Sequence, residues 1–121
     1  MILTGSGNGA LSGSRFDNHL IGNAGNNRIT GHGGSDTLEG GAGADTFVMM
    51  EEFGDDVVLD FLPGTDRINV LNWDGIETID DVWAASSEVD GGVLITVGED
   101  SLFLEGVALA ELKAADFVLA S

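Results

Sequence analysis

The residues GHGGSDTLEGGAGADTFV, 31–48, decide the fold of this chain, because they form two consecutive nine-residue units that each begin with glycine. Upstream, the same frame divides residues 4–12, 13–21 and 22–30 into three further units. Glycine occupies the first and the fourth position in four of the five units. The eighth position is always large and apolar, and its occupants are Leu11, Leu20, Ile29, Leu38 and Phe47. A fixed nine-residue period is typical of a solenoid built from stacked coils.

Each unit contains a turn and a strand. Glycine permits positive φ and a close approach of backbone segments, so the first six residues can turn sharply with their carbonyl groups directed inward. The last three residues form a short strand that buries the eighth side chain. Two units complete one coil. We therefore expect the loops of alternate units to stack, with residues 22–27 over 40–45 and residues 13–18 over 31–36.

The sixth position of the stacked loops carries oxygen ligands. Asn18 is expected to face Asp36, and Asn27 to face Asp45, with backbone carbonyls around each pair. Calcium takes roughly six to eight oxygen ligands, and the chain has no cysteine for a zinc–thiolate site, so the pattern predicts calcium. Asp56 lies close to one coil beyond Asp36 and is a further candidate. The predicted metal-site residues are Asn18, Gly22, Gly25, Asn27, Gly31, Gly33, Gly34, Asp36, Gly40, Gly41, Gly43, Asp45 and Asp56.

The early units depart from this pattern. Gly9 stands at the sixth position of the first unit, Phe16 replaces the fourth-position glycine of the second, and Asn18 and Asn27 offer neutral oxygens. Lower ligand charge weakens calcium binding, so we expect about two sites, centred on Asp36 and Asp45. The degenerate first unit also leads us to expect further coils in a longer parent protein.

From residue 57 onward the nonapeptides give way to longer strand patterns and tight turns. The predicted antiparallel strands are residues 57–61, 67–71, 93–97 and 101–105, and the candidate short helices are residues 77–88 and 108–116. An array of repeats needs an atypical segment to cover its end. We therefore predict an all-β fold in one continuous structural unit. A parallel β-roll occupies residues 1–48, and an antiparallel strand-rich cap with one or two short helices occupies residues 49–121.

The unit GGAGADTFV fits the pattern G-G-x-G-x-D-x-U-x fully, and GHGGSDTLE fits it nearly. The array therefore resembles the RTX (repeats in toxin) calcium-binding β-roll. The following segment resembles the region after the last repeat in serralysin-type metalloproteases and other type I secreted proteins of Gram-negative bacteria. The residues that carry this likeness are Asp60, Phe61, Pro63, Gly64 and Asp66. The chain end, residues 116–120, resembles the acidic residue and apolar run of their uncleaved export signal.

This resemblance implies a calcium-binding folding and export module at the C-terminus of a larger protein, secreted or exposed on the surface of a Gram-negative bacterium. Opposed carboxylates and many glycines predict that the roll is unstable without calcium, so that calcium drives folding after secretion. The implied partners are an N-terminal cargo domain and the type I secretion machinery. RTX modules also resemble accessory modules of alginate epimerases and adhesins. The alternative is therefore a polysaccharide-binding accessory module of a secreted enzyme or adhesin.

Charge and composition exclude several other functions. Twenty-one acidic residues against four basic ones give a net charge of −17, which repels nucleic acid and anionic lipid. No apolar run reaches the length of a membrane span, so we expect no membrane insertion. His19 and His32, the two histidines, lie in no catalytic spacing, and we predict a non-catalytic module. Trp73 and Trp83 are expected to fill the core of the cap and not to stack on a sugar.

Overall fold

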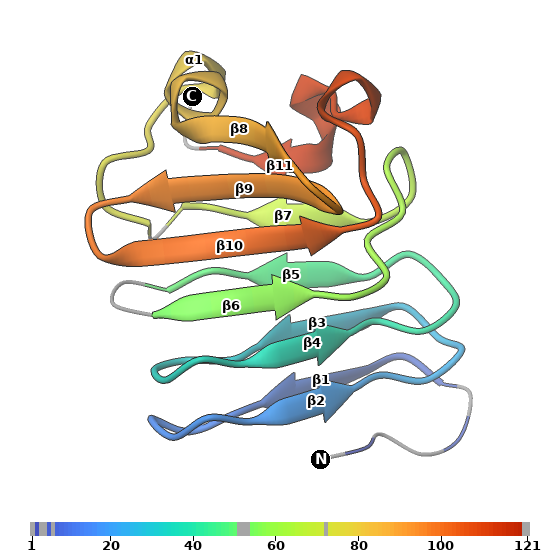
Figure 1. Cartoon of the computed structure of the whole chain (residues 1–121). Coiled ribbons are helices and arrows are strands. Elements are labelled where there is room, and N and C mark those ends of the chain that lie inside the picture. Colours follow the sequence, from blue (N-terminus) through green and yellow to red (C-terminus); the bar gives the residue numbers. More distant parts are fainter. Residues whose placement is uncertain (1, 3–4, 6, 51–53, 72, 120–121) are drawn as a thin grey trace.

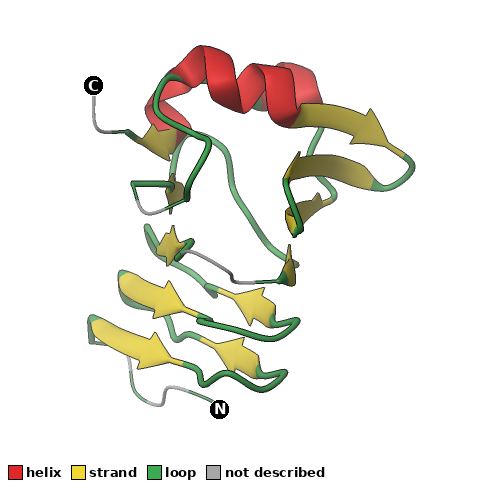
Figure 2. Cartoon of the chain, turned by 90° about the vertical axis from the view of Figure 1, so that its left-hand side faces the viewer, coloured by secondary structure: helices red, strands yellow, loops and turns green. Residues whose placement is uncertain are grey.

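The computed structural model describes residues 2, 5, 7–50, 54–71 and 73–119. It shows a roll of stacked coils that rises from the N-terminus at the bottom to a cap at the top (Figure 1), and its coils are flattened between two sheets (Figure 2). The first sheet has the order β1 (Gly9–Ser12), β3 (Asn27–Thr30), β5 (Thr46–Val48), β7 (Arg67–Asn69) and β11 (Phe117–Val118). The second has the order β2 (His19–Ile21), β4 (Thr37–Glu39), β6 (Asp55–Val58), β10 (Asp100–Glu105), β9 (Gly92–Val97) and β8 (Ser86–Val89).

The strands of the repeats pair in parallel, as the nine-residue period predicts. In the first sheet Leu11 lies opposite Ile29, and in the second Leu20 lies opposite Leu38. Loops that stack on each other are 18 residues apart in this part of the chain. The spacing grows to 20 and then 21 residues in the next two coils. The roll therefore continues beyond the repeats, with longer loops.

The core runs up the centre of the roll between the two sheets. All five eighth-position side chains are buried, and Val58, Ile68 and Leu104 extend the same two columns upward. Burying a side chain of this size contributes about 1.5–3 kcal/mol. Phe61 packs against Phe47, with ring centroids 6.3 Å apart, and so ties the segment after the repeats to the last repeat strand.

The prediction of antiparallel strands is wrong for residues 57–61 and 67–71. Strand β6 pairs in parallel with β4, and β7 pairs in parallel with β5. Strand composition does not encode direction, and the longer loops here complete a coil without reversing the chain. The prediction is confirmed for β9 and β10, which form a hairpin around a turn at Gly98 (φ 61°). Strand β8 adds to β9 in antiparallel orientation. Both parts of the chain thus share the same two sheets.

The first predicted helix exists in shorter form. Helix α1 (Ile79–Ala85) has Thr78 as its N-cap, and Thr78 and Asp81 form a capping box. The chain then enters β8. The helix predicted at residues 108–116 is wrong, because two 3₁₀ turns, Leu109–Glu111 and Ala114–Asp116, replace it. In each turn the last carboxylate accepts a backbone N–H three residues earlier, which closes the turn after three residues.

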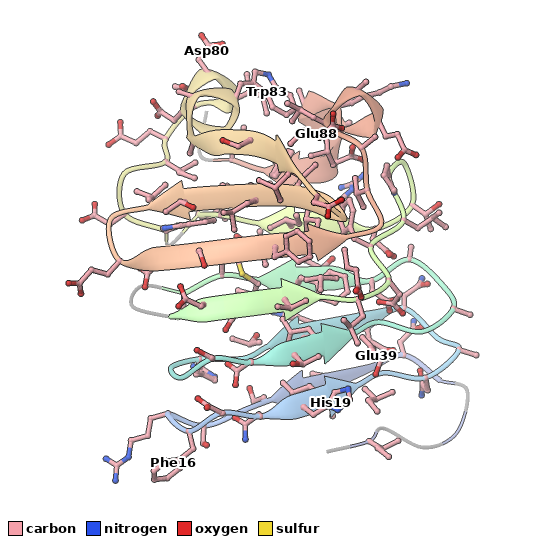
Figure 3. The ribbon with its side chains drawn as sticks, viewed as in Figure 1. Phe16, His19, Glu39, Asp80, Trp83 and Glu88 are labelled. Atoms are coloured by element: carbon pink, nitrogen blue, oxygen red, sulfur yellow. The ribbon has the colours of Figure 1, made fainter. Side chains whose placement is uncertain are left out.

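Both tryptophans lie in the cap, as predicted. Trp73 is buried, and Trp83, on α1 at the top of the molecule (Figure 3), packs edge-on against Phe117 with centroids 5.8 Å apart. Within the described residues, no helix is long and apolar enough to cross a membrane.

Candidate metal sites

The sixth-position side chains form a ladder along each edge of the roll. On the edge that carries the loops at the left of Figure 1, the backbone N–H of Asn18 donates to Oδ1 of Asp36 (2.8 Å). The N–H of Asp36 in turn donates to Oδ1 of Asp56 (2.8 Å). On the opposite edge the N–H of Asn27 donates to Oδ1 of Asp45 (2.8 Å). The loops therefore stack as the sequence predicts, and Asp56 takes its expected place above Asp36.

The first-position glycines make room for these side chains. A Cβ on Gly31 would lie 2.4 Å from Oδ2 of Asp36, and a Cβ on Gly40 would lie 2.4 Å from Oδ2 of Asp45. A Cβ on Gly22 would lie 2.4 Å from the carbonyl oxygen of Gly40 in the loop above. The amide oxygen of Asn27 lies equally close to that position. Each of these glycines therefore has side-chain oxygens of its own loop beside it, and at Gly22 also a carbonyl of the loop above, which together form a cradle for a small cation.

The other predicted glycines serve the stacking of the loops. A Cβ on any of the fourth-position glycines Gly25, Gly34 and Gly43 would lie 2.5–2.7 Å from a carbonyl oxygen of the loop below. Gly41, at the second position, has a φ of +82° and lies equally close to the carbonyl of Asn23. Gly33 differs, because a Cβ there would be 3.3 Å from its nearest neighbour and would meet no carbonyl at short range.

Three carboxylate oxygens have no visible partner. Oδ2 of Asp36, Asp45 and Asp56 is buried and accepts no hydrogen bond from the described residues. Burial raises the pKa of all three carboxyls, to about 6 for Asp45 and to about 8 for Asp56. Neighbouring carboxylates raise these pKa values further, Asp60 and Asp66 acting on Asp45 and Asp36 on Asp56. An ionised oxygen in such a place needs a cation.

The asparagine loops, residues 13–18 and 22–27, differ from the aspartate loops, residues 31–36 and 40–45, in how the sixth side chain is hydrogen-bonded. Oδ1 of Asn18 accepts the N–H of Ser14 (2.8 Å), and Oδ1 of Asn27 accepts the N–H of Asn23 (2.9 Å), in both cases the second residue of the same loop. In the aspartate loops this second residue has positive φ, 65° at His32, and the N–H of Gly41 donates to Asp60. In the asparagine loops the sixth side chain thus accepts a hydrogen bond from its own loop. In the aspartate loops Oδ2 of that side chain accepts none from the described residues.

Sequence reasoning missed the polar ladder at the fifth position. Oδ1 of Asn8 accepts the N–H of Asn26, and Oδ1 of Asn26 accepts the N–H of Ala44, both at 2.7 Å. On the other edge Asp17 accepts the N–H of Ser35 at the same distance. These bonds join the coils without a metal. Polar residues at the fifth position of units one to three were the signal for this ladder.

Three aspartates of the cap also reach the loops, and none was predicted as a site residue. The two oxygens of Asp60 accept the N–H groups of Gly40 and Gly41, each at 2.9 Å. Asp66 accepts from Asp45 and Leu62, so both of its oxygens are used. Asp100 accepts the N–H of Gly54. For the first two, the segment Asp60-Phe61-x-Pro-Gly-x-Asp66 was the available signal.

The donor set suits calcium. Among the described residues no group of three or more His, Cys, Asp or Glu side chains converges as a metal site. Backbone carbonyls and one or two carboxylate or amide oxygens must therefore supply the ligands, and hard oxygen ligands in a flexible arrangement favour calcium over transition metals. The buried Oδ2 atoms and the glycine cradles fit such an ion.

Comparison with a family model agrees with this chemistry. Residues 12–47 match the RTX calcium-binding nonapeptide repeat in four copies. RTX nonapeptide repeats bind calcium. The repeat region of this chain is therefore an RTX array, and the first unit, residues 4–12, contributes almost nothing to the match. No curated protein sequence matches the chain.

One solved structure shows the same fold. The extracellular lipase LipA from Serratia marcescens superposes with a TM-score of 0.77 and 24% identity over 97% of this chain, which spans 20% of the lipase. Two subunits of the Azotobacter vinelandii mannuronan C5-epimerase also match. AlgE6R3 has 27% identity and a TM-score of 0.39 and covers 97% of this chain and 81% of its own. AlgE6R2 has 24% identity and a TM-score of 0.48 and covers 92% of both chains. The likeness to the lipase identifies the fold as a β-roll.

Proposed function

We propose that this chain is a non-catalytic, calcium-dependent folding and export module of a larger secreted protein. The observation that carries the proposal is the set of buried Oδ2 atoms on Asp36, Asp45 and Asp56, which have no partner among the described residues. A buried, unpaired carboxylate destabilises the fold unless it is protonated or bound to a cation. Calcium at the glycine cradles removes that penalty.

The proposed ligands come from stacked loops. Asp36 and Asp45 supply carboxylate oxygens, and Asn18 and Asn27 lie below them in the ladders. Carbonyls of the repeat glycines complete the set, with Asp56 serving the upper coil. Because the ligands meet only when the loops are stacked, the ion binds the folded roll and not the open chain. Each site then stabilises the fold by RT ln(1 + [Ca²⁺]/Kd), about 4 kcal/mol at a thousandfold excess over Kd.

The order of export and folding follows from the C-terminal residues. Asp116 accepts the N–H of Gly64 (2.8 Å), Phe117 packs against Trp83, and β11 pairs with β7. A recognition signal in residues 116–120 is therefore covered once the cap has folded. Ala120 lies outside the described residues. The segment must therefore be read by the secretion machinery before folding. Low calcium inside the cell keeps the roll (residues 1–48) unfolded. Higher calcium outside the cell lets the roll fold beneath the cap (residues 49–121), next to the cargo domain.

Circular dichroism on the full chain tests the coupling of folding to calcium. We expect the β signal to be lost in calcium-free buffer with EGTA and to return when calcium is added. Equimolar magnesium should not restore it, because magnesium requires a small octahedral site and gives up its water reluctantly. A spectrum that is the same with and without calcium would contradict the proposal.

A further inference from the structure

The two sheets of the roll end in the edge strands β1, β11, β2 and β8, and three of these edges are protected. Strand β8 carries Glu88, whose carboxylate accepts the N–H of Leu109 from the neighbouring 3₁₀ turn (2.9 Å). Strand β11 is only two residues long. Strand β2 forms a parallel bridge from Ile21 to Ile2. Charged side chains, short strands and covering segments all keep a sheet edge from pairing with another chain.

The fourth edge, strand β1 at the bottom of Figure 1, has none of these devices. Its residues 9–12, GALS, include no charge and no proline, and among the described residues β1 pairs with β3 alone. The N–H of Gly13 donates to the carbonyl of Thr30 at the end of β3 (2.8 Å). Because backbone groups alternate in direction along a strand, those of Ala10 and Ser12 are directed away from β3. They face the open edge.

Two apolar side chains are exposed at the lower end of the roll, which consists of β1, β2 and the loop at residues 13–18. Phe16 and Ile2 are each 66% exposed. Phe16 stands where four of the five units have glycine, and it lies at the lowest level of the roll (Figure 3). The guanidinium of Arg15 lies 5.3 Å from the centroid of its ring. Aromatic and arginine side chains are the types that most often dominate the binding energy of protein interfaces.

Charge is distributed unevenly along the roll. Residues 1–35 contain one acidic side chain, Asp17, and two basic ones, Arg15 and Arg28, which gives a charge of +1. Residues 36–121 contain the other twenty acidic side chains and two basic ones, which gives −18. Because the coils rise in sequence order from the N-terminus (Figure 1), the negative charge lies above the lower end. Two copies that meet through their lower ends therefore keep their acidic parts far apart.

We infer that two copies of this chain associate through their lower ends, with β1 of one copy antiparallel to β1 of the other. A two-fold axis beside Leu11 places Ala10 of each copy opposite Ser12 of the other, so the outward backbone groups of both strands become paired. Phe16 adds apolar area at the same level. The end of one coil is small for an interface, so we expect reversible association in the micromolar range. This inference goes beyond the proposed export function and does not depend on it.

Cross-linking tests which surface forms the contact. The chain has no cysteine, so a single introduced thiol marks one place. Ser12→Cys lies on an exposed position of β1, and the matched control Ser87→Cys lies on an exposed position of β8, the edge strand of the second sheet in the cap. In calcium, with a short bis-maleimide at micromolar protein, S12C should form covalent dimers and S87C should stay monomeric. Equal yields of dimer from the two variants would overturn the inference.

Sedimentation velocity in calcium measures the association of the unmodified chain. We expect the wild type to change from monomer to dimer as its concentration rises through the micromolar range. A wild type that remains monomeric would overturn the inference and would leave the edge of β1 to residues upstream in the parent protein. Circular dichroism in the same buffer follows calcium-dependent folding separately, so the proposed function would stand in that case.

Two substitutions locate the contact further. Ala10→Pro removes an outward N–H and keeps the bonds between β1 and β3, so it should raise the dissociation constant of the dimer about tenfold. Phe16→Ser covers the case in which A10P does not fold, because this exposed side chain is not part of the core, and we expect a similar increase. The matched control is Leu62→Ser, which changes an exposed side chain beyond the repeats and should leave the dimer unchanged. A wild-type dissociation constant in F16S, or an equal increase in L62S, would overturn the inference.

Discussion

The asparagine loops and the aspartate loops of this roll have the same length and stack in one register, yet they are stabilised in different ways. In loops 13–18 and 22–27 the sixth side chain accepts an N–H of its own loop. In loops 31–36 and 40–45 that N–H is turned away by a positive φ at the second residue, and one carboxylate oxygen stays buried without a partner among the described residues. The two kinds of loop thus differ by one atom of the sixth side chain, which is an amide nitrogen in asparagine and a carboxylate oxygen in aspartate. The loop with asparagine bonds its own side chain, and the loop with aspartate needs a cation.

This difference teaches that dependence on calcium is graded along the chain. The lowest coils are joined by amide ladders, including the Asn8–Asn26 bond. The upper loops carry carboxylates whose pKa values are raised by burial and by one another. Calcium should therefore act mainly on the upper loops and on their junction with the cap, while the asparagine coils add packing and hydrogen bonds that no metal controls.

Gly40→Ala should have the largest effect on the aspartate loops. The added methyl would lie 2.4 Å from Oδ2 and 2.8 Å from Cγ of Asp45, so the carboxylate must leave the cradle. We expect the calcium-bound protein to lose about 2–3 kcal/mol of unfolding free energy and one calcium ion. Thermal unfolding in calcium and calorimetry measure both.

The control for this substitution is Gly33→Ala, in which the new methyl has 3.3 Å to its nearest neighbour, Cα of Arg15. It should cost far less stability and no ion. Equal losses in G33A and G40A would show that the cradle beside Asp45 has no special role.

Exchanging the two loop types should have the next largest effect. Asp45→Asn keeps the acceptor for Asn27 and removes the buried, unpaired charge, so it should bind one ion fewer and be more stable without calcium by about 1 kcal/mol. Asn27→Asp places a second carboxylate in the ladder and should act in the opposite direction, with lower stability in calcium-free buffer and a larger gain on adding calcium. Calcium titrations and melts of the two variants are the measurement. Changes of the same sign in both variants would contradict the comparison of the loops.

The sequence allowed the roll to be predicted because its period is carried by backbone requirements that only glycine meets, and by buried residues such as Leu38. The same period placed Asp36 and Asp45 correctly in the ladders. The direction of β6 and β7 was not predictable, since strand composition is the same for parallel and antiparallel pairing. Asp60 stands in a recognisable segment, but nothing in that segment names its partner Gly40, 20 residues away. Asp100 was missed because its contact with Gly54 joins segments 46 residues apart that no local pattern connects.

The pH dependence should also separate the two kinds of loop. Burial raises the folded pKa of Asp45 to about 6 and that of Asp56 to about 8, from an ordinary value of 3.8. The folded, calcium-free roll therefore holds more protons than the unfolded chain. Its stability is greatest at low pH and is lost as pH rises through these folded pKa values.

Between pH 5.5 and pH 8.5 in calcium-free buffer we expect a loss of about 2 kcal/mol, measured by urea unfolding followed by circular dichroism. With calcium present the trend should reverse, because the ion needs ionised carboxylates and competes with protons. A double variant, D45N with D56N, should have a flat calcium-free profile over this range. A slope that persists in the double variant would assign the effect to other groups.

The smallest effect should come from the outer face of the coils, where neither loop type is involved. Nε2 of His19 lies 2.7 Å from Oε2 of Glu39, and both side chains belong to strands of the second sheet, β2 and β4 (Figure 3). An exposed pair of this kind contributes about 0–1 kcal/mol, so Glu39→Gln should change stability by no more than that. The change should be equal with and without calcium, because Glu39 contacts the loop residue Gly22 only through its backbone carbonyl, which the substitution keeps. A calcium-dependent difference in E39Q would mean that the face of the roll, and not only its loops, responds to the ion.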